Sequence, residues 1–331
     1  MAYVDYHTYL SYIEPVRYYY TSFKKYNHKS VFHYCSIESF QKIIDPYIMG
    51  KTIERVVGPD KYDLLYCSFI ATHIRYLNDE QEYKEGRDLL NKLVSKRPKS
   101  KMKEPNDEIY VACFCDEPDN LTQWKYYGSN SGIAIEFSTE DVLLNYCNKL
   151  DYSDSFDIVF TPFDVFYENH LKAISNFKMA TNRLFSEYAQ NQALIPYMKN
   201  HNFKGERESR IVLYNLRKSK RGTDASSAQY RISQGMFKPY LEMRLFLNNA
   251  KGQKTLPIKS ITVGPGINAD KICYSLSQML EPQKTRALRY MDDINKKCRP
   301  KPGRKKDERK LVYTTSNGIE IYKSSVPFRD Y

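Results

Sequence analysis

The stretch Phe203-Lys204-Gly205-Glu206-Arg207-Glu208-Ser209-Arg210 runs directly into the apolar segment Ile211-Val212-Leu213-Tyr214. This pattern predicts a turn that leads into a strand carrying two carboxylates. Because side chains alternate along a strand, we expect Glu206, Glu208 and Arg210 to share one face. Two acids roughly 7 Å apart on that face could act together on one substrate, as paired carboxylates do at a sugar centre.

The same row of acids and bases is also typical of a charge ladder between neighbouring strands on a solvated sheet face. In that interpretation Arg210 neutralises Glu208, and the pair has a structural role. Short motifs of this kind often match by chance. The choice between the two interpretations therefore depends on the rest of the chain.

The composition predicts a globular protein with a basic surface. The chain has 331 residues, of which 41% are hydrophobic, and this suffices for a substantial core. A net charge of +12 together with 30 tyrosines favours nucleic acid as a partner, because cations bind phosphates and aromatic rings stack on bases. The seven cysteines are odd in number and scattered, so we expect neither a disulfide framework nor a zinc site.

The hydropathy pattern bears on localisation. No run of eighteen apolar residues occurs, and the first residues lack the charged start and apolar stretch of a signal peptide. We therefore expect a cytoplasmic protein that does not associate with membranes.

Helical and strand patterns mix without regular alternation, which predicts the α+β class. We expect an aromatic-rich helical extension over residues 1–30 and a single α+β domain over 31–331. Within that domain, residues 296–310 form a basic, proline-containing loop with nine Lys or Arg and two acids, a local net charge of 9 − 2 = +7. The expected strands are 31–34, 108–115, 132–137, 207–214, 236–247 and 257–263, with a hairpin at 311–322; the expected helices start after Ser36, Asp79 and Asp119 and cover 164–190 and 270–280.

Several short motifs, taken in order, resemble a prokaryotic family described as domain-of-unknown-function family 2971. The motifs are Phe32-His33-Tyr34, Tyr76-Leu77-Asn78-Asp79-Glu80-Gln81-Glu82, Cys113-Phe114-Cys115, Asp119-x-Leu121-x-x-Trp124-x-x-Tyr127-Gly128, Gly132 to Phe137, Glu206-x-Glu208-x-Arg210, Pro239-Tyr240-Leu241-Glu242, Ile261-Thr262-Val263-Gly264-Pro265 and Ser325-Val326-Pro327-Phe328-Arg329. They extend from about residue 31 to the end of the chain.

This family in turn looks like a distant relative of the ADP-ribosyltransferases, including those of bacterial toxins and phage-defence systems that modify nucleic acids. The resemblance implies an ADP-ribosyltransferase-like mixed sheet core with flanking helices. It also implies NAD as a substrate, ADP-ribose transfer to a macromolecular acceptor such as DNA or RNA, and a protein antitoxin or regulator as a further partner.

The resemblance also implies roles for individual residues. Glu208 would bind the nicotinamide-ribose 2′-hydroxyl and stabilise an oxocarbenium-like transition state, and Glu206 would help the acceptor attack. A carboxylate suits this role because cleavage of an N-glycosidic bond develops positive charge on the sugar. The residues implied to bind NAD are His33, Tyr34, Trp124, Tyr127, Asn78 and Arg210. On these grounds we expect Glu208→Gln to abolish activity with little loss of stability.

Other interpretations stay open for the same residues. His33 and Trp124 are also typical of core positions, and the Asn78 motif is explained equally by helix capping. The chain lacks a glycine-rich phosphate loop, so NAD binding follows from the resemblance alone. The alternative functions are a magnesium-dependent nuclease and a non-catalytic nucleic-acid-binding module. The nuclease would use Asp79, Glu82, Glu206 and Glu208.

Overall fold

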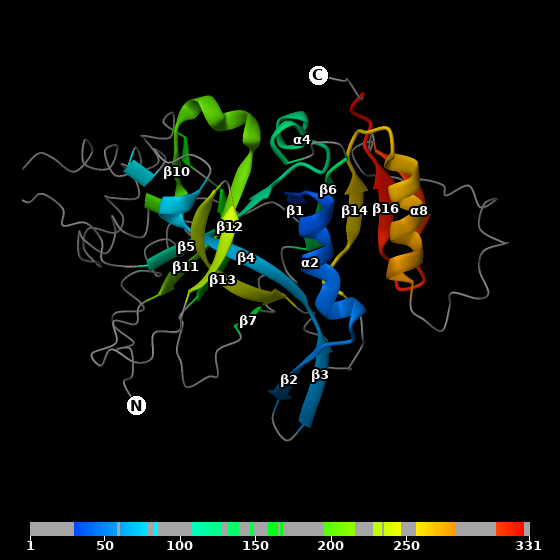
Figure 1. The fold of residues 1–331 in the computed structure, drawn as a ribbon, viewed down its shortest axis with the longest axis horizontal. Coiled ribbons are helices and arrows are strands. Elements are labelled where there is room, and N and C mark those ends of the chain that lie inside the picture. The colour runs from blue at the N-terminus through cyan, green and yellow to red at the C-terminus, as the bar shows by residue number, and fades with distance from the viewer. Residues whose placement is uncertain are drawn as a thin grey trace, which may run out of the picture. The chain divides into compact units, whose positions relative to one another are not determined.

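The chain forms an α+β structure that divides into two compact units, seen in a computed structural model (Figure 1). Unit 1 comprises Met1–His28, Phe69–Phe114 and Tyr146–Arg244, and unit 2 comprises Lys29–Ser68, Cys115–Asn145 and Leu245–Tyr331. Mixed, mostly antiparallel strand pairing confirms the α+β prediction. The structure describes residues 30–57, 60–77, 83–84, 108–127, 131–138, 146–148, 158–164, 166–167, 195–215, 228–233, 235–245, 256–281 and 309–327.

A sheet with the order β1-β6-β14-β16-β15 organises unit 2. β6 pairs antiparallel with both β1 and β14, whereas β14 and β16 run parallel. Parallel neighbours need a crossover connection, and the helix α8 (Ala269–Leu280) lies on that connection and packs against β14, β15 and β16 (Figure 1). The strands are β1 (Ser30–Cys35), β6 (Ile133–Ser138), β14 (Ser260–Val263), β15 (Lys310–Thr314) and β16 (Glu320–Lys323).

Two further helices of unit 2 begin at side-chain caps. The Ser36 hydroxyl accepts a hydrogen bond from the Ser39 amide (3.2 Å) at the start of α2 (Ile37–Ile48), as the sequence predicts. The helix α4 (Leu121–Tyr127) is capped by Asn120, whose Oδ1 accepts from the Thr122 amide at 2.8 Å. The prediction that Asp119 caps this helix is therefore wrong by one residue.

Two hairpins also belong to unit 2. β15 and β16 pair antiparallel around the predicted Asn317-Gly318 turn, where Gly318 has a φ of +88° that suits glycine. The second hairpin joins β2 (Thr52–Val57) to β3 (Asp60–Leu65), which the sequence analysis did not predict.

Unit 1 contains strands in the order β12-β13-β4-β5, with β11 paired to both β5 and β8. The predicted strand after Arg207 corresponds to β11, and its Ile211, Val212 and Leu213 are fully buried. The strands are β4 (Cys67–His73, mostly in this unit), β5 (Glu108–Cys115), β7 (Tyr146–Asn148), β8 (Ile158–Asp164), β9 (Phe166–Tyr167), β10 (Met198–Lys199), β11 (Glu208–Asn215), β12 (Gln229–Ser233) and β13 (Met236–Leu245).

Part of the sequence prediction concerns residues outside those described. The extension over 1–30, the helix after Asp79 and the loop over 296–310 fall almost entirely there. The prediction that a helix starts at Asp164 is wrong, because the strand β8 ends at that residue and the strand β9 follows it. Among the described residues, no helix combines the length and hydropathy needed to span a bilayer.

Candidate functional site

The two glutamates of the acid pair lie on different elements of unit 1. Glu206 ends the short 3-10 helix η4 (His201–Glu206), and β11 begins only at Glu208. Between them Arg207 adopts a left-handed conformation (φ 47°, ψ 51°), which is uncommon for a residue other than glycine. The expectation that both acids lie on one strand is therefore wrong, because a left-handed turn separates them.

Glu208 is held by Arg210, two residues further along β11. The Arg210 Nε donates to Glu208 Oε1 at 2.8 Å and its Nη2 donates to Oε2 at 2.9 Å, which is a bidentate pair. The third branch of the guanidinium, Nη1, donates to the Pro196 carbonyl at 2.8 Å. Glu208 and Arg210 therefore share one strand face, as the sequence predicts.

A residue that the sequence analysis missed joins the two acids. The Lys199 ammonium, on β10, donates to Glu206 Oε2 at 2.7 Å and to Glu208 Oε2 at 2.8 Å. It also lies 5.1 Å from the centre of the Phe203 ring, within range of a cation–π contact. Lys199 thus connects the carboxylates that the left-handed turn at Arg207 separates.

This acid cluster, defined as Lys199, Glu206, Glu208 and Arg210, is largely buried and carries two positive and two negative charges. Glu208 is 5% exposed and Arg210 1%, whereas the Glu206 side chain is 16% exposed. Burial raises the pKa of Glu208, but the charges of Arg210 and Lys199 outweigh it and hold that pKa below its usual value. Glu208 is therefore a carboxylate at physiological pH.

A cysteine of the neighbouring strand also contacts Glu208. The Cys113 thiol, on β5, forms a side-chain hydrogen bond with the Glu208 carboxylate. Burial, followed by the negative charge of Glu208, raises the pKa of Cys113 well above its usual value. Cys113 therefore keeps its proton and donates it to this hydrogen bond.

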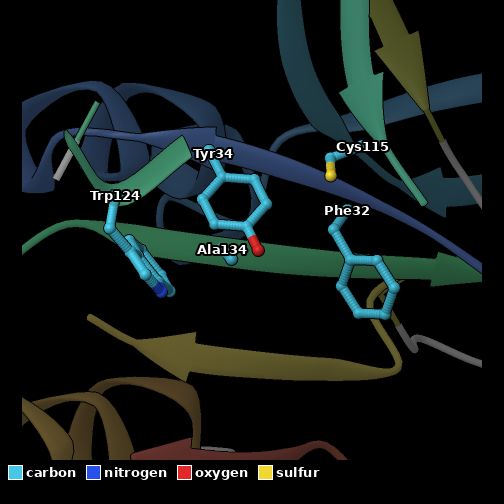
Figure 2. Close-up of a cluster of buried hydrophobic side chains, with 5 residues drawn as sticks. All are labelled: Phe32, Tyr34, Cys115, Trp124 and Ala134. Atoms are coloured by element: carbon cyan, nitrogen blue, oxygen red, sulfur yellow. The ribbon is translucent and has the colours of Figure 1, made fainter. Parts of the chain in front are cut away.

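Tyr34 and Trp124 lie together in unit 2, in a buried cluster with Phe32, Cys115 and Ala134 (Figure 2). The rings of Tyr34 and Trp124 meet edge to face with centroids 4.6 Å apart, and the residues are 6% and 4% exposed. Burial raises the pKa of Tyr34, so its hydroxyl stays protonated. In this arrangement both rings form core packing.

The polar atoms of the same two side chains have protein partners. The Tyr34 hydroxyl donates to the Glu117 carbonyl at 2.8 Å and accepts from the Asn120 amide at 2.9 Å. The Trp124 indole donates to Asp119 Oδ1 at 2.7 Å. These bonds supply a structural reason for Tyr34 and Trp124, whose binding of NAD stays a prediction.

Three sequence motifs that are far apart in the chain meet around Trp124. Asp119 accepts from the Ser324 hydroxyl (2.6 Å) and from the amide and hydroxyl of Ser325 (2.8 and 2.9 Å). Gly264 lies so close to Trp124 that a Cβ at this glycine would be 2.9 Å from the indole. Asp119, Gly264 and Ser325 thus come together with Trp124, although they lie in three separate motifs.

The remaining predicted residues are placed separately. His33 is half-buried on β1, where it pairs with Ile135, and Tyr127 ends α4 with 37% of its surface exposed. Of the two tyrosines implied to bind NAD, Tyr127 is therefore the one that a ligand could reach. Asn78 lies outside the described residues, as do Asp79 and Glu82 of the nuclease alternative.

The acid cluster lies in unit 1, and the Tyr34–Trp124 cluster lies in unit 2. Within the described part of the chain, no group of three or more His, Cys, Asp or Glu residues is placed to hold a metal ion. The two described acids of the nuclease alternative instead bind Lys199, and Glu208 also binds Arg210.

Comparison with known proteins gives one match. Residues 123–211 match a family described as "Protein of unknown function (DUF2971)", which confirms the predicted family over that segment. The matched segment includes Trp124 and the whole Glu206-x-Glu208-x-Arg210 motif. No curated protein and no solved structure gives a significant match.

Proposed function

We propose that this chain is an enzyme that transfers ADP-ribose from NAD to a macromolecular acceptor, with nucleic acid as the favoured acceptor. The observation that carries the proposal is the pair of carboxylates joined by one ammonium group. Lys199 holds Glu206 and Glu208 at 2.7 and 2.8 Å and so fixes the two acids relative to one another. Fixed carboxylates stabilise a developing positive charge without having to reorganise during the reaction.

The chemistry of NAD suits such a pair. Cleavage of its N-glycosidic bond leaves positive charge on the ribose and releases neutral nicotinamide, so no general acid is needed. One carboxylate can stabilise the charged sugar while a second orients the acceptor. The basic chain, with its net charge of +12, favours a polyanionic acceptor.

Burial divides the roles between the two acids in this proposal. Glu206 is the acid with the more exposed side chain, so it is the one that substrate would reach. Glu208 is enclosed by Arg210, Lys199 and Cys113 and acts through Lys199 as a positioning residue. The family resemblance implies instead that Glu208 contacts the ribose. In this proposal Glu206 contacts the substrate, and Glu208 positions Glu206.

The proposal is tested by incubating the purified chain with NAD and single-stranded DNA or RNA. Mass spectrometry of the acceptor should show an added ADP-ribose, and free nicotinamide should appear in the same sample. We expect Glu206→Gln to lower the transfer rate at least about 100-fold, the usual effect of removing a group that acts on the reacting centre.

Glu242→Gln provides the control, because Glu242 is a partly exposed acid of β13 outside the acid cluster. That variant should retain the full rate. If no acceptor class leads to nicotinamide release, the proposed function is wrong. If Glu206→Gln keeps full turnover, the function stands and the assignment of Glu206 falls.

A second candidate function is a non-catalytic nucleic-acid-binding module. The observation in its favour is that Arg210 and Lys199 already bind both oxygens of Glu208, as they would in a purely structural cluster. Nucleic-acid binding that weakens steeply with salt, without any product from NAD, would support the module over the enzyme.

A further inference from the structure

Large apolar side chains are exposed together at the tip of the β12–β13 hairpin in unit 1. Ile232 pairs directly with Phe237, and Tyr230 pairs with Pro239 on the same face. Tyr230, Ile232 and Phe237 are 67%, 74% and 70% exposed. We propose that this face, the hairpin platform, binds single-stranded nucleic acid by stacking bases on the Tyr230 and Phe237 rings. The proposal rests on the proposed function in one respect, since it names where the acceptor binds.

The hairpin platform continues the core face of its own strand. Residues alternate along β13, so Leu241 and Met243 lie on the same face as Phe237, and both are buried. Towards the tip this apolar row extends past the core and becomes exposed. Adjacent exposed side chains of this size mark an interaction surface more often than scattered single ones do.

The positive charge of the chain indicates which kind of partner the platform binds. Among the described strands, β12 is at the end of its sheet order, and its central residue is the exposed Arg231. Arg231 pairs with Lys238 across the hairpin, and its Nη2 donates to the Thr72 hydroxyl at 3.1 Å. If a second copy paired antiparallel about the centre of β12, two Arg231 side chains would lie opposite one another and repel.

A polyanion is attracted instead, because the chain has a net charge of +12. A single strand is favoured over a duplex because its unpaired bases can leave their stack and lie flat on aromatic rings. Tyr230 and Phe237 offer such rings on one sheet face, where Ile232 adds apolar surface directly opposite Phe237. The platform thus provides the stacking surface. Arg231 lies on the opposite face of β12, so the attraction of phosphates comes from the basic chain as a whole.

The test measures binding of fluorescently labelled oligo-dT and oligo-U by anisotropy, without NAD. The key variant is Tyr230→Leu/Phe237→Leu, which retains apolar surface but removes both rings. We expect at least ten-fold weaker binding, because each base–ring stack contributes about five-fold or more. Binding should also weaken steeply as salt is raised, because phosphates are attracted to a chain with a net charge of +12.

Tyr274→Leu is the control, since Tyr274 is an exposed ring on α8, outside the platform. It should bind as the unaltered chain does, and thermal melts should show that both variants are folded. Unchanged binding in the double variant overturns the proposal, as does absence of oligonucleotide binding by the unaltered chain. A dimer that the double variant dissociates, with oligonucleotide binding unchanged, assigns the face to a second copy and also overturns it.

The test separates this inference from the proposed function. If the rings are needed for oligonucleotide binding but NAD gives no product, the platform stands and the transferase proposal fails. If ADP-ribose is transferred to nucleic acid equally well by the double variant, the transferase stands and the platform fails.

Discussion

Strands β11 and β13 each carry a glutamate two residues before an arginine, yet the two pairs differ in contact distance and in burial. Glu208 and Arg210 make two contacts of 2.8 and 2.9 Å, and their side chains are 4% and 1% exposed. Glu242 and Arg244 approach to 3.6 Å, with side chains 20% and 19% exposed. The same sequence pattern therefore produces a buried bidentate pair on one strand and a longer, partly buried pair on the other.

The difference arises from neighbours that the pattern does not contain. Lys199 and Cys113 reach Glu208 from β10 and β5, and the Pro196 carbonyl accepts from Arg210. A buried charge is tolerated only when such partners satisfy it, whereas an exposed charge is satisfied by water. The two strands should accordingly respond very differently to the loss of one charge.

The largest expected effect is the loss of stability in Glu208→Gln. This change leaves Arg210 and Lys199 buried with only Glu206 to balance them, and breaking a buried pair costs about 3–5 kcal/mol. Glu242→Gln should cost less, because its contact with Arg244 is longer, at 3.6 Å, and its side chain is more exposed, at 20%. Urea unfolding of both variants measures this difference, and equal costs would remove the distinction between the strands. The expectation from sequence that Glu208→Gln is neutral for stability is revised accordingly.

Lys199→Met should have the next largest effect, about 3 kcal/mol, because the shared cation between Glu206 and Glu208 is lost. Adding Glu206→Gln to this variant restores the charge balance of the acid cluster. The double variant should therefore recover at least about 0.5 kcal/mol relative to additivity. Lys199→Met combined with Glu242→Gln serves as the control and should be additive. Additive behaviour in both combinations would contradict the shared contact.

The pH dependence of stability provides a smaller effect. The pKa of Glu208 is lowered in the folded protein, so its contribution is fully present above the unfolded value of about 4.3 and is lost as the pH falls below it. Unfolding free energies between about pH 5 and pH 2.5 should thus fall less steeply in Glu208→Gln, by up to about 1.4 kcal/mol per pH unit. Parallel curves for the variant and the unaltered chain would contradict this assignment.

The smallest effect concerns salt. The coupling between Glu242 and Arg244, measured by a double-mutant cycle, should be below about 1 kcal/mol and should shrink in 1 M NaCl, where charges are screened within about 3 Å. The cost of Glu208→Gln should change little, because solvent ions do not enter the acid cluster. A Glu208→Gln cost that decreases with salt as the surface coupling does would show that the cluster is solvated.

Local patterns predicted the three described α-helices and half of the described strands; the strands that were not predicted are β2, β3, β4, β7, β8, β9, β10 and β12. Strands β1, β6 and β11 and helices α2 and α8 combine apolar periodicity with a turn or a polar residue at one end, and these signals are local. The position of the α4 cap could not be predicted, because Asp119 and Asn120 are both suitable caps. The Asp119 carboxylate instead accepts hydrogen bonds from Ser324, Ser325 and Trp124. The two serines come near Asp119 only in the folded chain.

Lys199 illustrates why the site was predicted only in part. It lies on a two-residue strand that pairs with β9, seven and nine residues before the glutamates it binds. No single helix or strand spans these positions, so their meeting depends on the path of the chain through η4 and Arg207. The partners within β11 could be predicted, because Glu208 and Arg210 follow the two-residue repeat of a strand.

The sharing of Lys199 between two acids also has an evolutionary consequence. No one of positions 199, 206 and 208 can change its charge without leaving another partner unbalanced in a buried setting. Substitution should therefore proceed in compensating pairs, and among related chains these positions should co-vary as one block with 210. Glu242 and Arg244, which are more exposed and share a longer contact, should co-vary less strongly.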